Sequence, residues 1–146
     1  MHALKSDLIR ETVEECFGSD QALISTFHIY SGRPLGECVD KTVSDLNKAE
    51  TTFQFYQVKE GPKLAGFFGI ERGYYLTTIF IHPDYRAKDK IGQVWELIAS
   101  HFPEEFYTAV FSKNTRAVKF YTRNGAVHSE STADGHPITI FKLRKN

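Results

Sequence analysis

Two segments in the second half of the chain carry residue types that could bind an anion and donate a proton. The first runs from His82 to Lys90, between a predicted strand and a predicted helix. Unpaired N–H groups at the start of a helix attract anions. Arg86, Lys88 and Lys90 would add positive charge there. A solvated charged loop is the alternative interpretation of this segment taken alone.

The second segment, residues 114–126, is NTRAVKFYTRNGA. On a helix, Asn114, Ala117 and Tyr121 lie on one stripe because they are spaced by three and four residues. A polar group, a small residue and a phenol would then face the same way, and the small residue would let a ligand pass close. The purely structural alternative makes Ala117 helix filler and Tyr121 a tyrosine at the rim of the core.

Hydrophobic periodicity predicts the elements that position these segments. The first fifty residues show helical spacing in three short pieces, with Ser6 and Asp20 as candidate N-caps of the first two. From Thr51 the period falls to two, which is typical of strands. The order predicted from there is a hairpin (51–58 and 64–70), a central strand (74–81), a helix (91–102), a strand (106–111), a helix (114–124) and a last hairpin (126–131 and 137–143). Gly125 suits a left-handed position at the end of the last helix.

These elements predict a mixed α/β fold in one domain. The chain has 146 residues, 41% of them hydrophobic and 14% aromatic, which excludes a disordered protein. No apolar run is long enough for a membrane span, and charges interrupt any signal sequence, so we expect a cytoplasmic protein. Cys16 and Cys38 lie 22 residues apart without a C-x-x-C pattern. We therefore expect reduced cysteines and no metal site.

Together the two segments resemble the GNAT superfamily of acyl-CoA-dependent N-acetyltransferases. That family shows a strand ending in V-x-P, then Y-R-G-K-G-I-G opening a helix, a short strand, and N-x-x-A-x-x-F-Y-x-x-x-G-F. Here residues 81–86 are IHPDYR, and Ile91 and Gly92 follow. The second motif has Ala126 in place of the usual Phe and matches at Asn114, Ala117, Phe120, Tyr121 and Gly125. The resemblance implies a GNAT-like fold over residues 1–146, with a helical acceptor side (1–50) and a cofactor-binding part (51–146).

The resemblance also implies where acetyl-CoA binds. The backbone of the strand before the loop would hold the pantetheine arm, and the amides of the loop would hold the pyrophosphate. Asn114 would contact the arm, and Tyr121 would protonate the leaving thiolate, for which a neutral phenol is suited. The cofactor-binding positions carried over in this way are Ile79, Phe80, Ile81, Arg86, Ala87, Lys88, Asp89, Lys90, Ile91, Gly92, Asn114, Ala117, Phe120 and Tyr121.

Two departures from the family pattern concern the phosphates and the general base. Residues 86–92 (RAKDKIG) are one residue longer than the family loop and lack its first glycines, and Asp89 adds a negative charge. The strand at 74–81 contains no carboxylate. Glu71 before it and His82 after it are the nearest candidates for the base, with a strand-end residue as the alternative role of His82. An amine of lowered pKa could also attack without a base.

These features predict an acetyltransferase (EC 2.3.1) that moves an acetyl group from acetyl-CoA to a primary amine by direct attack on the thioester. The alternative is a catalytically degenerate domain of the same fold, acting as a binding or assembly module. A net charge of zero argues against a nucleic-acid binder. The resemblance does not identify the acceptor amine, and it is compatible with a homodimer.

The even charge total hides an asymmetry between the two halves. Residues 1–60 hold 6 basic and 10 acidic side chains, and residues 61–146 hold 12 and 8. The resemblance places an anionic cofactor against the basic half and much of the acceptor site against the acidic half. This distribution favours a cationic amine as acceptor.

Overall fold

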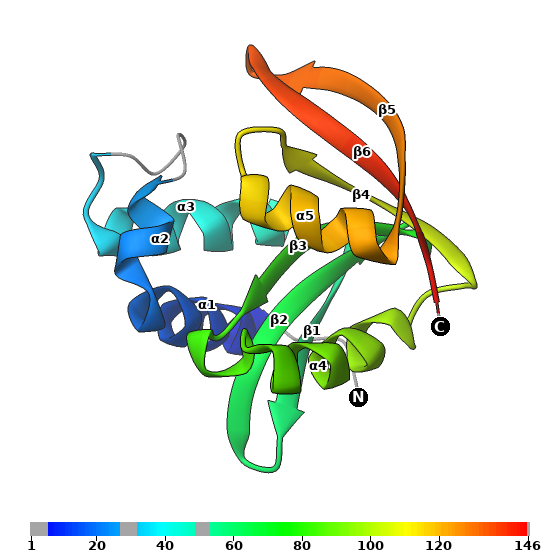
Figure 1. Ribbon diagram of the computed structural model, residues 1–146. Coiled ribbons are helices and arrows are strands. Elements are labelled where there is room, and N and C mark those ends of the chain that lie inside the picture. Colours follow the sequence, from blue (N-terminus) through cyan, green and yellow to red (C-terminus); the bar gives the residue numbers. More distant parts are fainter. Residues whose placement is uncertain (1–5, 27–31, 49–52, 146) are drawn as a thin grey trace.

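The computed structural model of the chain describes residues 6–26, 32–48 and 53–145. Within these ranges, strands form one mixed sheet in the order β1-β2-β3-β4-β6-β5, and helices lie on both of its faces (Figure 1). The helices are α1 (Ser6–Ser19), α2 (Gln21–Thr26), α3 (Leu35–Lys48), α4 (Lys88–Ala99) and α5 (Thr115–Asn124), with a short 3-10 turn η1 (Pro83–Tyr85). The strands are β1 (Phe53–Glu60), β2 (Lys63–Glu71), β3 (Tyr75–Ile81), β4 (Glu105–Phe111), β5 (Gly125–Ala133) and β6 (His136–Arg144). The predicted α/β class and element order are confirmed.

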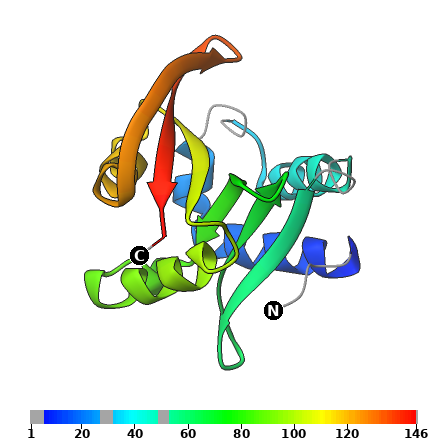
Figure 2. The same ribbon diagram turned by 90° about the vertical axis from the view of Figure 1, so that its right-hand side faces the viewer.

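Two hydrophobic cores fill the space between the sheet and its two helix layers. Apolar residues of α1, α2 and α3 pack on one face against side chains such as Phe67 and Phe80. On the opposite face α4 and α5 pack through Trp95 and Tyr121 against residues such as Phe68. Figure 2 shows α1 and α3 on one side of the sheet, α4 and α5 on the other, and the β5–β6 hairpin projecting away from both layers.

Two helix starts differ from the sequence-based expectation, and a third agrees with it. Asp20 is the predicted N-cap of α2, and its Oδ1 accepts a hydrogen bond from the N–H of Leu23 at 3.1 Å. The helix predicted from residue 91 begins instead at Lys88, because its first turn is charged and shows no apolar spacing. Ser6 is the first residue of α1 rather than the residue before it. The end of the second predicted helix, after Thr26, lies outside the described residues.

Gly125 corrects another prediction. Its φ is −177° and its ψ −155°, which is extended and not left-handed. The strand β5 begins directly at this residue, in register with Leu143 of β6. A Cβ atom at Gly125 would lie 2.1 Å from the backbone oxygen of Lys142 and 2.9 Å from the Cα of Leu143. Glycine is therefore required here by the close approach of the neighbouring strand.

The parallel strands β3 and β4 pair over only two positions. Tyr75 is in register with Tyr107 and Leu76 with Thr108, and no later residue of either strand pairs with the other. Beyond these pairs the strands diverge (Figure 1). We call the unpaired segments, Thr77–Ile81 of β3 and Ala109–Phe111 of β4, the wedge.

No helix in the described part of the chain is long and apolar enough to cross a bilayer. Cys16 and Cys38 are both buried and unbridged, as predicted. Burial raises the pKa of the Cys16 thiol to about 12, so this side chain stays protonated and unreactive.

Replacing Gly125 with Ala should lower the free energy of unfolding by about 1–3 kcal/mol, since the added methyl group meets backbone atoms that cannot rotate away. Urea denaturation would measure the change. Gly18→Ala is the control, because Gly18 lies in α1 with nothing within 4 Å of its Cβ position. That control should be neutral or stabilising by up to about 1 kcal/mol. Equal stabilities of the two variants would contradict the close approach at Gly125.

Candidate active site

The wedge exposes backbone groups of β3 on the side that faces β4. A Cβ atom at Gly66 would lie 2.1 Å from the carbonyl oxygen of Phe80, so this carbonyl points toward β2. Backbone groups of successive residues in a strand point alternately to its two edges. The N–H and C=O groups of Ile79 and Ile81 therefore point into the wedge. They lie where an extended amide-containing ligand could pair with them as an additional strand would.

A β-bulge lies at the start of the wedge. Gly69 of β2 is in register with Thr78, and Ile70 is in register with Leu76, so Thr77 is the extra residue of β3. The Oγ1 atom of Thr77 is buried and is the one buried side-chain polar atom without a hydrogen-bond partner among the described residues. A buried hydroxyl without a partner is costly, and such groups concentrate at binding and catalytic sites.

Thr108 and Tyr121 meet at the closed end of the wedge. The Thr108 hydroxyl donates to the carbonyl oxygen of Leu76 at 2.8 Å, at the last paired position of the two strands. The Tyr121 hydroxyl hydrogen-bonds to the same threonine side chain. Burial raises the pKa of Tyr121 well above its usual value, and the bond to Thr108 only partly opposes this. The phenol is therefore neutral at physiological pH and can act only as a hydrogen donor or acceptor.

Arg86 follows the end of β3 and the turn η1, at the open end of the wedge. Its Nε donates to the carbonyl oxygen of Ile81 at 2.8 Å, and its Nη1 donates to Oδ2 of Asp20. The guanidinium lies over the ring of Phe80, 5.3 Å from its centroid. The structure thus places a positive charge where β3 ends and the connection to α4 begins.

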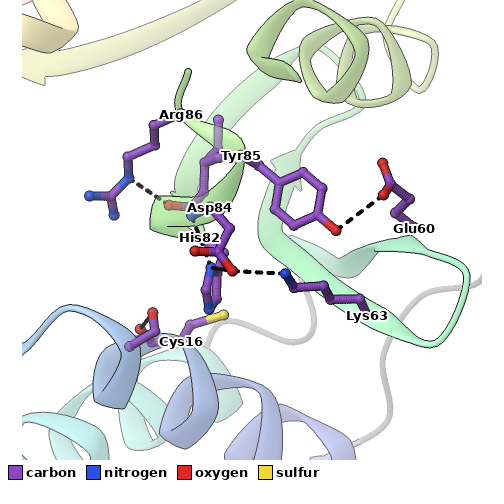
Figure 3. Close-up of polar contacts among 9 residues, drawn as sticks. Cys16, Glu60, Lys63, His82, Asp84, Tyr85 and Arg86 are labelled. Carbon is purple, nitrogen blue, oxygen red and sulfur yellow. Dashed lines mark hydrogen bonds and ion pairs between the residues drawn. The ribbon is translucent and has the colours of Figure 1, made fainter. Parts of the chain in front are cut away.

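A second polar cluster fixes the connection between β3 and α4 to the β1–β2 hairpin (Figure 3). His82 caps η1 by accepting a hydrogen bond at Nδ1 from the N–H of Asp84 at 3.2 Å. The Asp84 carboxylate binds Nζ of Lys63 at 2.8 Å. The buried Tyr85 ring lies 5.4 Å from the ammonium groups of both Lys63 and Lys90, and its hydroxyl faces Glu60 at 3.5 Å. The predicted role of His82 as a strand-end residue is thus realised as a cap.

The predicted phosphate loop is shorter than the sequence suggested, because Lys88 to Gly92 belong to α4. Ala87 is the N-cap and has no side chain that could accept from the first-turn N–H groups. The N–H groups of Lys90 and Ile91 donate to the carbonyl oxygen of Ala87. Within the described residues, those of Lys88 and Asp89 are therefore available to an anion. Asp89 is exposed in the same turn, whereas Lys90 is directed over Tyr85.

The second motif forms α5 as predicted, and its residues divide between capping and packing. Asn114 is the N-cap, and its Oδ1 accepts from the N–H of Ala117 at 3.3 Å. Ala117 and Phe120 are half-buried against the core, and Tyr121 is only 3% exposed. The predicted stripe is confirmed for Ala117 and Tyr121, which both pack into the core against the sheet. It is wrong for Asn114, whose side chain turns back to cap its own helix.

The two candidate bases lie at opposite ends of β3. Glu71 is in register with Tyr75, next to the closed end of the wedge, whereas His82 follows the open end. Seven residues of strand separate Tyr75 from His82, or roughly 23 Å at about 3.3 Å per residue. A single reacting group cannot meet both side chains. Burial raises the pKa of Tyr75, and the negative charge of Glu71 raises it further. The Glu71 carboxylate therefore lies close to a partly desolvated side chain.

The sequence model of the Acetyltransferase (GNAT) family matches residues 19–126, which span the wedge, Arg86 and α5. The chain belongs to the GNAT family. A search of curated protein sequences finds no match.

Solved structures of GNAT proteins share the fold. An acetyltransferase from Thermus thermophilus superposes with a TM-score of 0.71 at 16% identity, covering 99% of each chain. An acetyltransferase from Salmonella typhimurium that modifies the N-terminal serine of ribosomal protein L7/L12 gives 0.68 at 11% identity, covering 99% of this chain and 93% of that one. A spermidine N-acetyltransferase (F149A mutant) from Vibrio cholerae gives 0.62 at 15% identity, covering 98% and 93%. At these identities the likeness establishes the fold of this GNAT chain and not its substrate.

Sequence reasoning missed three polar residues of the site in this GNAT chain. Asp20 was predicted only as a helix cap, and nothing local links it to Arg86, 66 positions later. Thr108 gave no signal within its short strand. Thr77 did give a signal in the sequence, because two adjacent threonines interrupt the apolar run of residues 74–81. Such a break is consistent with a bulge. In the described part of the chain, no cluster of His, Cys, Asp or Glu side chains could hold a metal ion.

Thr77, at the start of the wedge, and Thr108, at the last paired position before it, should respond oppositely to the same substitution. Thr77→Val removes a buried hydroxyl that has no partner, so the variant should be more stable by about 1 kcal/mol. Thr108→Val leaves the Leu76 carbonyl and the Tyr121 hydroxyl without their partner, so it should be less stable by about 1–3 kcal/mol. Denaturant unfolding of both variants measures the difference. A loss of stability in Thr77→Val as large as that in Thr108→Val would show that the Thr77 hydroxyl is satisfied.

Proposed function

We propose that this GNAT protein transfers an acetyl group from acetyl-CoA to a primary amine by direct attack of the amine on the thioester. The observation that carries the proposal is the two-residue pairing of β3 with β4, which opens the sheet beside a buried phenol. The family supports an acetyltransferase, and two of the similar solved structures, RimL and the PaiA N-acetyltransferase of Thermoplasma acidophilum, are complexes with coenzyme A.

The residues of the wedge suit the amide-rich arm of coenzyme A. The N–H and C=O groups of Ile79 and the N–H of Ile81 can pair with the arm's amides as an adjacent strand would. At the open end, the first turn of α4 and the guanidinium of Arg86 would face the diphosphate.

The proposed reaction forms a bond between the amine nitrogen and the carbonyl carbon and breaks the carbon–sulfur bond. The thiolate leaves toward Tyr121 at the closed end of the wedge. Because the pKa of this phenol is raised well above that of a thiol, Tyr121 stabilises the departing sulfur mainly as a hydrogen-bond donor. For this its O–H turns to the sulfur from Thr108, whose own hydroxyl hydrogen is donated to Leu76. Full protonation of the thiolate can then follow from water.

The proton released by the amine needs an acceptor on the closed side of the wedge. Of the two predicted bases we propose Glu71, since its strand register places it beside Tyr75, whereas His82 lies at the diphosphate end and caps η1. Water can relay the proton, and an amine with a lowered pKa needs less help from the carboxylate.

For the acceptor we propose a cationic amine that the acidic half of the chain steers. Six carboxylates of α1 and α3 are exposed: Glu11, Glu14, Glu15, Glu37, Asp40 and Asp45. They lie on outer helix surfaces, where Arg10 and Lys41 pair with some of them. Their contribution is therefore long-range attraction, which falls with salt, and not direct contact.

Binding of acetyl-CoA is the first test of the proposal. At a 100-fold excess over its dissociation constant, a ligand of the native state adds about 2.7 kcal/mol to the free energy of unfolding. A thermal shift of several degrees with millimolar acetyl-CoA is the expected result in differential scanning fluorimetry. No shift would overturn the proposal and favour the non-catalytic alternative, a domain of the same fold that serves as a binding or assembly module.

Tyr121→Phe tests the chemical step. Removing the hydroxyl should lower the rate of acetyl transfer by about 100-fold, the usual effect of losing one preorganised donor, with little change in acetyl-CoA affinity. Acetyl-CoA-dependent turnover is measured by release of free thiol with a panel of primary amines. Tyr74→Phe is the control, since Tyr74 is 42% exposed and lies before β3. Loss of binding in Tyr121→Phe would assign the phenol a structural role instead.

A further inference from the structure

The Arg86 guanidinium is held in one orientation by three groups, two from β3 and one from the residue before α2. Nε bonds to the carbonyl oxygen of Ile81 at the end of β3, Nη1 bonds to Asp20 before α2, and the plane rests on the Phe80 ring. Phe80 itself is 7% exposed and stacks on Phe67 at 6.1 Å. Nη2 has no hydrogen-bond partner in the described part of the chain. Toward the described residues, the guanidinium therefore leaves the two N–H donors of Nη2 unused at the open end of the wedge.

Asp20 uses its two carboxylate oxygens for two different tasks. Oδ1 caps α2 through the N–H of Leu23 at 3.1 Å, and Oδ2 binds Arg86 at 2.5 Å. The side chains of Asp20 and Arg86 are 21% and 17% exposed, so the pair is largely shielded from water. An ion pair in this environment is stronger and more restrictive than one on an open surface.

The surrounding charges fit a site for a multiply charged anion. Desolvation raises the pKa of Asp20, but the hydrogen bonds from Arg86 and Leu23 and the positive charges of Arg86 and Arg116 outweigh it and lower the pKa. The carboxylate is thus ionised in the native state and neutralises only one of two nearby guanidinium groups. A net positive charge remains beside the free Nη2 donors.

We propose that Asp20 is a positioning residue, which holds Arg86 so that its free Nη2 faces the diphosphate of acetyl-CoA at the open end of the wedge. This inference rests on the proposed function. It assigns the N-terminal helical segment a part in cofactor binding, although the sequence placed that segment on the acceptor side only. It also links the acceptor side to the cofactor side, because Asp20, which orients Arg86, is the residue that caps α2.

Asp20→Asn separates the two tasks of the residue. Asparagine is as good an N-cap as aspartate, so α2 keeps its first hydrogen bond while the charge that orients Arg86 is lost. Asp40→Asn is the matched control, since it breaks an exposed pair with Arg10 far from the wedge. Circular dichroism and thermal unfolding of both variants show whether each one folds.

The decisive measurement compares two ligands, acetyl-CoA and acetyl-pantetheine, which lacks the diphosphate. We expect Asp20→Asn to weaken acetyl-CoA binding by about tenfold, a coupling of roughly 1.4 kcal/mol, and to leave acetyl-pantetheine binding within about twofold of the wild type. Titration followed by thermal shift gives both dissociation constants. An equal loss for both ligands would make Asp20 a structural residue only. Tighter binding of acetyl-CoA by the variant would show that the Asp20 carboxylate competes with the diphosphate for Arg86. Either result overturns the proposal.

A double-mutant cycle with Arg86→Gln provides a second measurement that does not depend on acetyl-pantetheine. If Asp20 acts through Arg86, the double variant should bind acetyl-CoA no more weakly than Arg86→Gln alone. Additive losses would contradict the proposal. Failure of the wild-type protein to bind acetyl-CoA at all would instead overturn the proposed function, so the two failures are distinguishable.

Discussion

The site depends on the early end of pairing between two parallel strands. β4 remains paired with β6 along all seven of its residues, and β3 remains paired with β2 on its other edge. Each strand is thus anchored on one side and free on the other, and the backbone groups on the free edges need partners. The bulge at Thr77 bends β3 at the point where the pairing with β4 ends. A sheet that would otherwise be continuous becomes a place for an amide-containing ligand.

The polar groups around the wedge differ in how far they are satisfied. At the closed end, Thr108, the Leu76 carbonyl and Tyr121 form a complete network, which stabilises the last paired position. One residue further, the Thr77 hydroxyl has no partner. A fully bonded group contributes to folding, whereas a buried group without a partner costs free energy unless a ligand supplies the bond.

The connection from β3 to α4 is rigid because it is fixed from two directions. On one side Asp84 and Tyr85 bind groups of the β1–β2 hairpin through Lys63 and Glu60. On the other side Arg86 binds Asp20 at the start of α2. Residues 86–92 lack the first glycines of the family loop, and Arg86 places a side-chain positive charge at this connection instead.

The sequence by itself determined the order of helices and strands, the cap at Asp20, and the last hairpin, whose turn at Asp134 and Gly135 has φ of 52° and 77°. The cap at Asn114 emerged from the structure. Periodicity and cap chemistry are local properties, so a single chain displays them. Only the tertiary structure decided the Asp20–Arg86 pair, the bulge at Thr77, the close approach at Gly125 and the separation of Glu71 from His82. Each of these depends on contacts between distant segments or on strand register, and neither leaves a periodic trace in the residues themselves.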